Sequence, residues 1–167
     1  MAEDLSISTR SGFSLATIMA RKSSDPEALS RKIGVPLPSG PRTSKAGSLM
    51  LIGTGPGVWL AFSDKPAIDS AEQLQARVGA LASVSDQSSA YSVLRLAGHD
   101  ARRLLQRGVA IDLHPSQFGP GQVATSMIAH IGVILWQVDD LPTYEIATFR
   151  SFAESFRHWV DVTERAL

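Results

Sequence analysis

The side chains that could carry out chemistry in this 167-residue chain are few and scattered. The four histidines are His99, His114, His130 and His158, and none lies within five residues of another, so no local pair has the spacing of a metal site. The chain has no cysteine, which excludes disulfides, thiol catalysis and thiolate metal ligands. His99, at a predicted helix start, and His114, before Pro115, are most simply structural. His130 lies among apolar residues, so we expect a hydrogen-bonded core histidine there rather than a catalytic base.

Two other motifs could indicate catalysis or cofactor binding. Asp139 and Asp140 are adjacent carboxylates, but they precede Leu141 and Pro142, and this sequence is typical of a solvated turn. The glycine-rich segment 53–57 suggests a dinucleotide-binding loop. That fingerprint requires glycine at the position of Val58 and a helix after it, whereas the residues that follow are typical of a strand. No Gly-x-Ser-x-Gly motif is present. We therefore assign no catalytic, cofactor-binding or metal-binding residue.

Aromatic and basic residues suggest binding rather than catalysis. Tryptophan is enriched at the energetic centres of interfaces, so Trp59, Trp136 and Trp159 are candidates for contact with a partner, although most large aromatic side chains should be in the core. Arg102, Arg103 and Arg107 would share one face of a helix. On a neutral protein such a face is usually solvated, and an ion-paired contact with a partner is the alternative.

The composition is that of a globular protein without a polyanionic partner. Hydrophobic residues make up 44% of the chain and charged residues 19%. Sixteen basic and sixteen acidic side chains cancel, which argues against broad nucleic-acid or membrane-surface binding. Residues 1–5 include two acids and no apolar run, so we expect no signal peptide and a cytoplasmic protein. The apolar run 123–138 is too short and too polar to span a membrane.

Local signals predict four helices. Asp25, Pro26 and Glu27 are typical of a helix start, and Gly34 of its end. Asp69 with Glu72 resembles a capping box, and apolar residues at helical spacing follow it. We expect the other two helices at 99–107, ended by Gly108, and at about 150–164, with one buried face made of Phe152, Phe156, Trp159, Val160 and Thr163.

Between these helices the sequence predicts strands and loops. The predicted strands are a short one at 13–19, a hairpin at 49–62, strand residues within 83–96, two adjacent buried strands at 122–129 and 131–138, and a strand at 144–148. We expect a single domain, with residues 1–11 loose and a long Pro/Gly-rich loop at 34–48. The resulting class is α+β with a mixed or mostly antiparallel sheet, and the order of elements suggests two pseudo-repeated strand–helix units.

An ordered series of short segments resembles the gamma subunit of heterotetrameric sarcosine oxidase. The segments are 92–105 (Ser-Val-Leu-Arg-Leu-Ala-Gly-His-Asp-Ala-Arg-Arg-Leu-Leu), 111–115 (Ile-Asp-Leu-His-Pro), 129–131 and 150–156. A looser match covers 49–62. Each motif is weak alone, but the series keeps its order along roughly the second half of the chain.

The resemblance implies a non-catalytic subunit. Sarcosine oxidases of this type demethylate sarcosine oxidatively to glycine. The resemblance places the flavins FAD and FMN, the NAD and the tetrahydrofolate site on partner subunits and none on this chain. It also implies alpha, beta and delta subunits as partners, and the isolated chain is expected to self-associate if it exposes its interface.

The gamma subunit is similar in fold to the folate-binding domain of aminomethyltransferase, the glycine-cleavage T-protein. Alignment with that family places Leu135 and Trp136 where the T-protein has a catalytic carboxylate, and neither can act as an acid or a base. Asp139 lies several residues later, and we do not carry the role over to it. Two functions stay open: a non-catalytic oxidase subunit, or a stand-alone degenerate folate-binding or one-carbon-binding domain.

Overall fold

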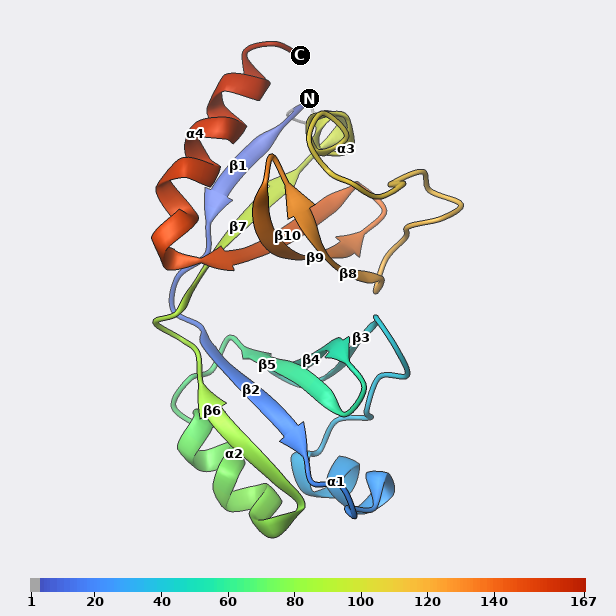
Figure 1. Ribbon diagram of the computed structural model, residues 1–167, viewed down its shortest axis with the longest axis vertical. Helices are drawn as coiled ribbons and strands as arrows, with labels where there is room; N and C mark the ends of the chain where they lie inside the picture. The colour runs from blue at the N-terminus through green and yellow to red at the C-terminus, as the bar shows by residue number, and fades with distance from the viewer. Residues whose placement is uncertain (1–3) are drawn as a thin grey trace. The chain divides into compact units, whose positions relative to one another are not determined.

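A computed structural model describes residues 4–167, and the contacts within it divide the chain into two compact units. The N-terminal unit is Ser11–Ser89, and the C-terminal unit is Ala90–Leu167 together with the segment that ends at Arg10. The chain therefore passes between the units twice, at 10–11 and at 89–90 (Figure 1). That the two units form a single folding domain stays a prediction.

The N-terminal unit is one antiparallel sheet with two helices. Its elements in chain order are β2 (Ser14–Ala20), α1 (Pro26–Ile33), β3 (Thr43–Ala46), β4 (Leu49–Gly55), β5 (Val58–Ser63), α2 (Ala71–Val78), the 3-10 turn η1 (Gly79–Leu81) and β6 (Ala82–Asp86). The strand order across the sheet is β3-β4-β5-β2-β6, and every neighbouring pair is antiparallel.

The C-terminal unit repeats this plan. Its elements are β1 (Ser6–Thr9), β7 (Tyr91–Ala97), α3 (His99–Leu105), β8 (Val123–Ile128), β9 (Ile131–Asp139), β10 (Thr143–Phe149), the 3-10 turn η2 (Arg150–Phe152) and α4 (Ala153–Glu164). The strand order is β1-β7-β10-β9-β8, again antiparallel throughout. The α+β class with antiparallel sheets is confirmed.

The suspected pseudo-repeat is present in the topology. In the N-terminal unit the path is strand, helix, three-stranded meander, helix, final strand, and in the C-terminal unit it is the same up to the second helix. The fifth strand of the C-terminal sheet is β1, which comes from the start of the chain and pairs with β7 as β6 pairs with β2. The two sheets therefore have equivalent strand orders. They differ in where the fifth strand comes from: it follows the second helix in the N-terminal unit and precedes all other elements in the C-terminal unit.

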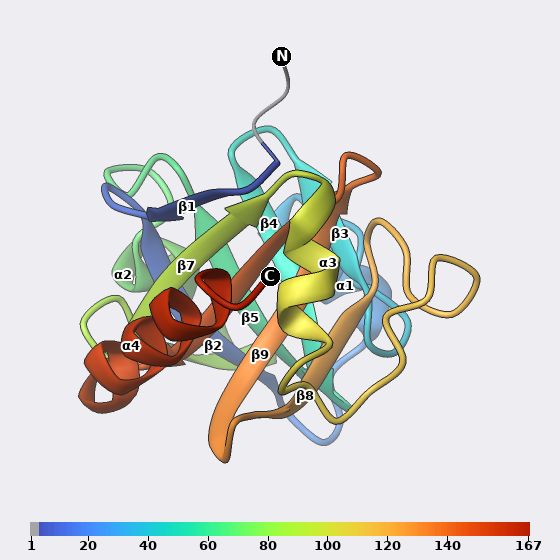
Figure 2. The ribbon, with the colours of Figure 1, turned by 90° about the horizontal axis from the view of Figure 1, so that it is seen from above.

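Each unit has its own apolar core between its helices and one face of its sheet. In the N-terminal unit, Leu29 and Ile33 of α1 and Leu74 and Val78 of α2 are buried against alternate residues of β2, β4 and β5. In the C-terminal unit, α3 and α4 lie over the same face of the sheet (Figure 2). Its core includes Leu104, Leu135, Tyr144, Phe156 and Val160, each at most 1% exposed.

The predicted ends of the first helix are confirmed. Asp25 accepts hydrogen bonds from the backbone N–H groups of Glu27 and Ala28, and Pro26 occupies the first helical position. Gly34 ends the helix in the left-handed conformation, with φ 85°. This conformation strains a residue with a Cβ, which is the physical reason for a glycine there.

Several predicted elements are wrong in extent. The part of 1–11 at Ser6–Thr9 is the strand β1, not loose chain, and residues 1–3 lie outside the described residues. The predicted loop 34–48 contains β3, which pairs with β4. The 83–96 segment holds two strands that belong to different sheets. Strands β1, β6 and β7 form by pairing with segments that are distant in the sequence, which local sequence does not record, whereas β3 pairs with β4 across a short turn.

The two C-terminal helices are also shorter than predicted. Helix α3 ends at Leu105, so Gly108 lies beyond its end instead of capping it. Helix α4 begins at Ala153, after η2, and Phe152 is 49% exposed rather than part of the buried face. Phe156 and Val160 form the buried face as expected, and Trp159 is partly buried at its edge.

Candidate partner-binding site

The described residues, 4–167, hold no group of three or more His, Cys, Asp or Glu side chains that could bind a metal ion. His114 Nδ1 lies 2.8 Å from the hydroxyl of its neighbour Ser116. The core position expected for His130 is wrong, because this residue is exposed. His130 and Ala129 form the two-residue turn between β8 and β9, with φ 68° and 49°, and therefore lie beyond the ends of both strands.

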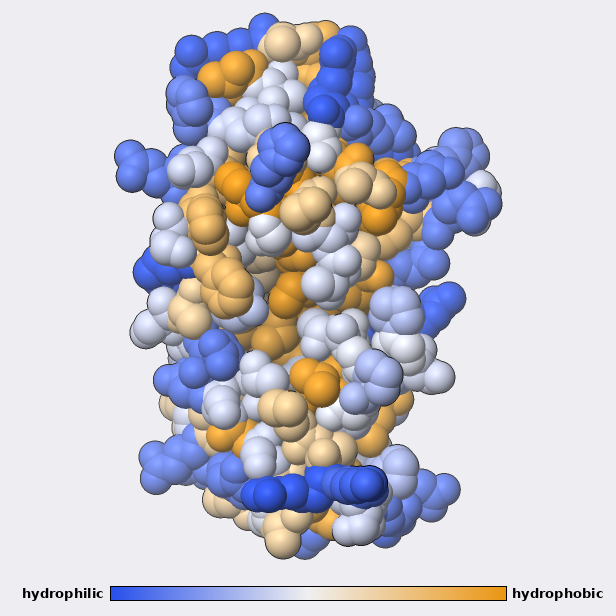
Figure 3. Space-filling view, in the orientation of Figure 1, coloured by the Kyte–Doolittle hydropathy of each residue, from blue (hydrophilic) through white to orange (hydrophobic). Residues whose placement is uncertain are grey.

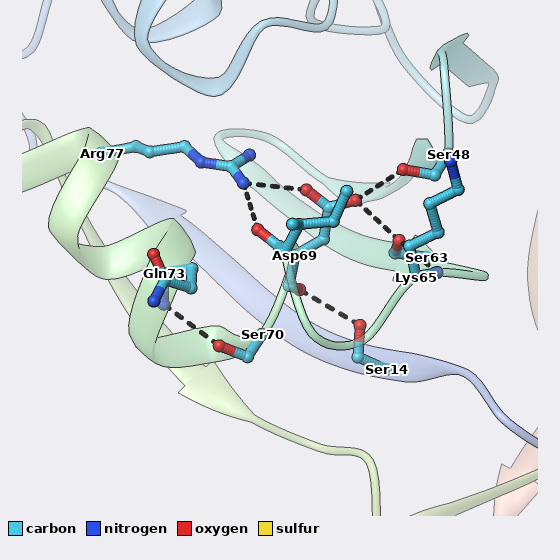
Figure 4. Close-up of polar contacts among 9 residues, drawn as sticks. Ser14, Ser48, Ser63, Lys65, Asp69, Ser70, Gln73 and Arg77 are labelled. Atoms are coloured by element: carbon cyan, nitrogen blue, oxygen red, sulfur yellow. Dashed lines mark hydrogen bonds and ion pairs between the residues drawn. The ribbon is translucent and has the colours of Figure 1, made fainter.

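The carboxylate of Asp69 is enclosed by hydrogen-bond donors in the N-terminal unit (Figure 4). The hydroxyls of Ser48 and Ser63 donate to Oδ2 at 2.8 and 2.7 Å, and Arg77 Nη2 donates to Oδ1 at 3.0 Å. Burial raises the pKa of Asp69, but the hydrogen bonds from Ser63, Ser48 and Arg77, with the charge of Arg77, outweigh it and hold the pKa below its ordinary value. A carboxylate so stabilised in its charged form is a poor base.

The helix predicted to start at Asp69 starts one residue later in the structure, at Ser70. Ser70 is the N-cap of α2, and its hydroxyl accepts from the backbone N–H of Gln73 at 3.2 Å. Asp69, only 5% exposed, instead ties the segment before α2 to residues at the ends of β4 and β5. The backbone carbonyl of Asp69 accepts from the Ser14 hydroxyl at 3.1 Å, which adds a tie to β2.

A second buried carboxylate, Glu145 on β10, lies in the C-terminal unit. Glu145 is 3% exposed and is ion-paired with Arg10 and with Arg95 Nη1, the latter at 3.2 Å. The indole N–H of Trp136 donates to its other oxygen at 3.1 Å. The four side chains come from β9, β10, β7 and the residue after β1, so the cluster cross-links four neighbouring strands.

The three tryptophans lie in different environments. Trp136 is 1% exposed and hydrogen-bonded to Glu145, while Leu135 beside it belongs to the C-terminal core. Trp59 is 7% exposed but lines two neighbouring surface hollows of about 400 and 270 Å³, which share Pro38, Gly57 and Trp59. Trp159 lines a hollow of about 420 Å³ in the C-terminal unit. That any of them contacts a partner stays a prediction.

The remaining predicted motifs have structural roles. Residues 53–57 comprise the end of β4 and the turn that leads into β5. In the β9–β10 turn, the carboxylate of Asp139 accepts a hydrogen bond from the backbone N–H of Leu141 at 3.0 Å. On the arginine face, Arg102 Nε donates to the hydroxyl of Tyr144 at 3.1 Å. Burial raises the pKa of that phenol, although the charge and hydrogen bond of Arg102 oppose it. None of these groups combines into a constellation for catalysis.

Within the described residues, no helix is both long enough and apolar enough to cross a membrane.

The arrangement of the chain defines a known fold class. It matches 46% of an aminomethyltransferase T of the glycine cleavage system from Bartonella henselae, over 95% of this chain, with a TM-score of 0.71 and 15% identity. This likeness shows a shared fold. A chain of the heterotetrameric sarcosine oxidase from Corynebacterium sp. U-96 matches with a TM-score of 0.86 and 28% identity, over 96% of this chain and 84% of that one.

Sequence comparison identifies the family within this fold class. The model of the sarcosine oxidase gamma subunit family matches residues 24–165, so the chain belongs to that family. It is 32% identical over 135 residues to the sarcosine oxidase subunit gamma of Corynebacterium sp. strain P-1, and 32% identical over 130 residues to that of strain U-96. The aligned regions cover 80% and 77% of this chain but only 66% and 62% of those two relatives.

Proposed function

We propose that this chain is the gamma subunit of a heterotetrameric sarcosine oxidase and acts by binding its partner subunits. The observation that carries the proposal is the match, over 96% of this chain, to a chain of the Corynebacterium heterotetrameric sarcosine oxidase. The family match over residues 24–165 supports the same assignment independently of the structure.

The chain itself is proposed to be non-catalytic. The resemblance to the T-protein family places Leu135 and Trp136 where that family carries its catalytic carboxylate, and both side chains are buried. The two buried carboxylates, Asp69 and Glu145, are engaged by hydrogen-bond donors and arginines. FAD, FMN, NAD and tetrahydrofolate are accordingly proposed to bind the partner subunits, where the oxidation of sarcosine takes place.

The proposed partners are the alpha, beta and delta subunits, assembled in the cytoplasm. A stable interface of this kind should bury at least about 1,200 Å² in total, with an apolar and aromatic centre. Trp59 and Trp159 line surface hollows and are the candidates for that centre, while Trp136 donates its indole N–H inside the molecule. An isolated chain that exposes such a surface is expected to self-associate.

Co-expression with the alpha, beta and delta subunits of the same genome, followed by size-exclusion chromatography, tests the proposal. We expect this chain to elute with the oxidase and the oxidase to lose stability when the chain is omitted. Separate elution, together with an oxidase that assembles and is stable without the chain, would show that the assignment is wrong. Tetrahydrofolate binding by the purified chain alone would instead favour a stand-alone folate-binding domain.

Activity assays on the purified chain test the non-catalytic role. We expect no turnover of sarcosine and no methyl transfer to tetrahydrofolate, because Leu135 and Trp136, which align with the catalytic carboxylate of the T-protein family, cannot act as an acid or a base. Measurable turnover in either assay would contradict this part of the proposal.

A further inference from the structure

Apolar side chains are exposed unequally in the two units. Eight large apolar side chains are exposed in the described chain, and six of them belong to the C-terminal unit: Met127, Val138, Leu141, Phe149, Phe152 and Val162. Figure 3 shows apolar side chains gathered between polar ones over the β8–β10 part of that unit. Exposed apolar groups that gather in this way mark interaction surfaces.

One hollow on the C-terminal unit combines such groups with a defined shape. We call it the Trp159 hollow; it has a volume of about 420 Å³ and is lined by Arg107, Gly108, Ala110, Met127, Ala129, His130 and Trp159. The lining comes from the segment after α3, the end of β8, the β8–β9 turn and α4. Met127 is 54% exposed, and Val162, one helical turn after Trp159, is 49% exposed.

The floor of the Trp159 hollow is held in place by contacts within the unit. A Cβ on Gly108 would lie 2.5 Å from Cζ2 of Trp159, so only glycine lets the indole pack on the backbone there. The backbone N–H of Ala129 donates to the carbonyl of Gly108 at 3.2 Å, and the Trp159 ring stacks on Phe156 with 6.0 Å between ring centroids. A surface fixed in this way loses little conformational freedom on binding.

The charge of the Trp159 hollow is positive. No aspartate or glutamate is among its lining residues. Within residues 4–167, Arg107 is exposed and forms no ion pair, whereas Arg103 on α3 pairs with Asp100 at 3.6 Å and Arg157 on α4 with Asp161 at 2.7 Å. An apolar floor beside an unpaired guanidinium complements an apolar side chain that is next to a carboxylate.

We propose that the Trp159 hollow docks a segment of a partner oxidase subunit that places an apolar side chain against Trp159 and Met127 and a carboxylate on Arg107. This inference rests on the proposed function and specifies where the interface lies. A single arginine and a neutral chain are too little charge for a nucleic acid, and a fixed hollow of this size fits one or two side chains of a protein.

The test compares matched substitutions in the two units. Met127→Glu and Arg107→Glu alter the hollow, while Met19→Glu and Arg31→Glu place the same changes on exposed residues of the N-terminal unit, where Met19 is 53% exposed. Each variant is co-expressed with the partner subunits, and the fraction retained in the oxidase peak is measured at low and high salt. Because all four side chains are exposed, the thermal unfolding of each purified variant should match that of the unsubstituted chain.

We expect both hollow variants to lower retention at least about tenfold and both control variants to leave it unchanged. Arg107→Lys should retain most binding, and Arg107→Glu should reverse the salt dependence, because high salt screens the repulsion between the two carboxylates. Equal retention of all variants in an oxidase that does contain this chain would overturn the docking site and leave the proposed function intact. Failure of the unsubstituted chain to join the oxidase would overturn both.

Discussion

The two units follow one topological plan but use their buried carboxylates differently. In the N-terminal unit, Asp69 lies in the loop before α2 and is held by two serines and one arginine. In the C-terminal unit, Glu145 lies in the middle of strand β10 and is held by two arginines and a tryptophan. The first carboxylate ties a loop to its sheet, and the second joins strands within a sheet.

This difference follows from how each sheet obtains its fifth strand. Strand β6 follows α2 after the short turn η1, so the N-terminal sheet obtains its fifth strand through a local connection. Strand β1 comes from the other end of the chain, and its pairing with β7 spans about half of the sequence. Arg10, which directly follows β1, reaches Glu145 and so anchors that distant strand. A long-range pairing costs more chain entropy, which a buried ion pair and its hydrogen bonds help to offset.

The largest expected effect comes from removing the aromatic centre of one core. Phe156→Ala in α4 should lower the free energy of unfolding by about 3–5 kcal/mol, because Phe156 is 1% exposed and its removal leaves a cavity. Leu74→Ala in α2, at a residue with 0% exposure, is the counterpart in the other unit, with about 2–5 kcal/mol expected. Denaturant unfolding measures both values. A change below about 1 kcal/mol for Phe156→Ala would mean that this face is not core.

The same experiment tests whether the two units unfold together. A single domain predicts one transition that both variants shift. Two transitions, each shifted by only one of the variants, would show that the units are separate domains.

A smaller effect is expected at the C-terminal carboxylate. Glu145→Gln should cost about 2 kcal/mol, because it removes the buried negative charge that pairs with Arg10 and Arg95 while keeping the size of the side chain. Urea unfolding of this variant is compared with Glu154→Gln, which changes an exposed residue in the first turn of α4. If the two variants were equally stable, the cluster around Glu145 would not anchor β1.

The smallest effect is expected at the N-terminal carboxylate, and it should depend on pH. The lowered pKa of Asp69 means that its stabilisation is fully present above the ordinary value of 3.8 and is lost as the pH falls through the lower pKa of the folded state. Asp69→Asn should therefore cost about 1 kcal/mol near neutral pH. Its difference from the unsubstituted chain should shrink in acid.

Unfolding curves at several pH values check this expectation, with Asp140→Asn at an exposed turn residue as the control. A cost that stays constant down to acid pH, or one that Asp140→Asn shares, would contradict the assigned role of Asp69.

Local signals in the sequence predicted the elements whose stability is local. The ends of α1 are set by Asp25, Pro26 and Gly34, which act on neighbouring backbone groups, and they were predicted correctly. The hairpin of β4 and β5 and the turn after Asp139 were also found, because glycine and aspartate direct the backbone within a few residues.

Features that depend on distant partners were missed. Asp69 looked like a helix cap, but its carboxylate binds Ser48, which lies 21 residues away, while Ser70 caps the helix. No local pattern marks Glu145, because Arg10 and Arg95 lie 135 and 50 residues away from it in the sequence. No local pattern encodes such contacts.

The environment of the candidate site was only partly predictable. The sequence singled out Trp159 but could not show that Gly108 makes room for its ring. His130 was predicted to be buried because its neighbours are apolar, whereas the turn that it forms with Ala129 exposes it. Apolar neighbours indicate that a residue lies near strands. They do not indicate whether the residue belongs to a strand or to the two-residue turn between two strands, where side chains are exposed.

Native mass spectrometry tests most directly whether this chain is a subunit of a sarcosine oxidase. The oxidase is purified from cells that contain the gene for this chain and from cells that lack it. We expect the first complex to carry one copy of this chain, and the second to be lighter by that mass and less stable. An oxidase of identical mass and stability from both strains would contradict the claim that this chain is a subunit.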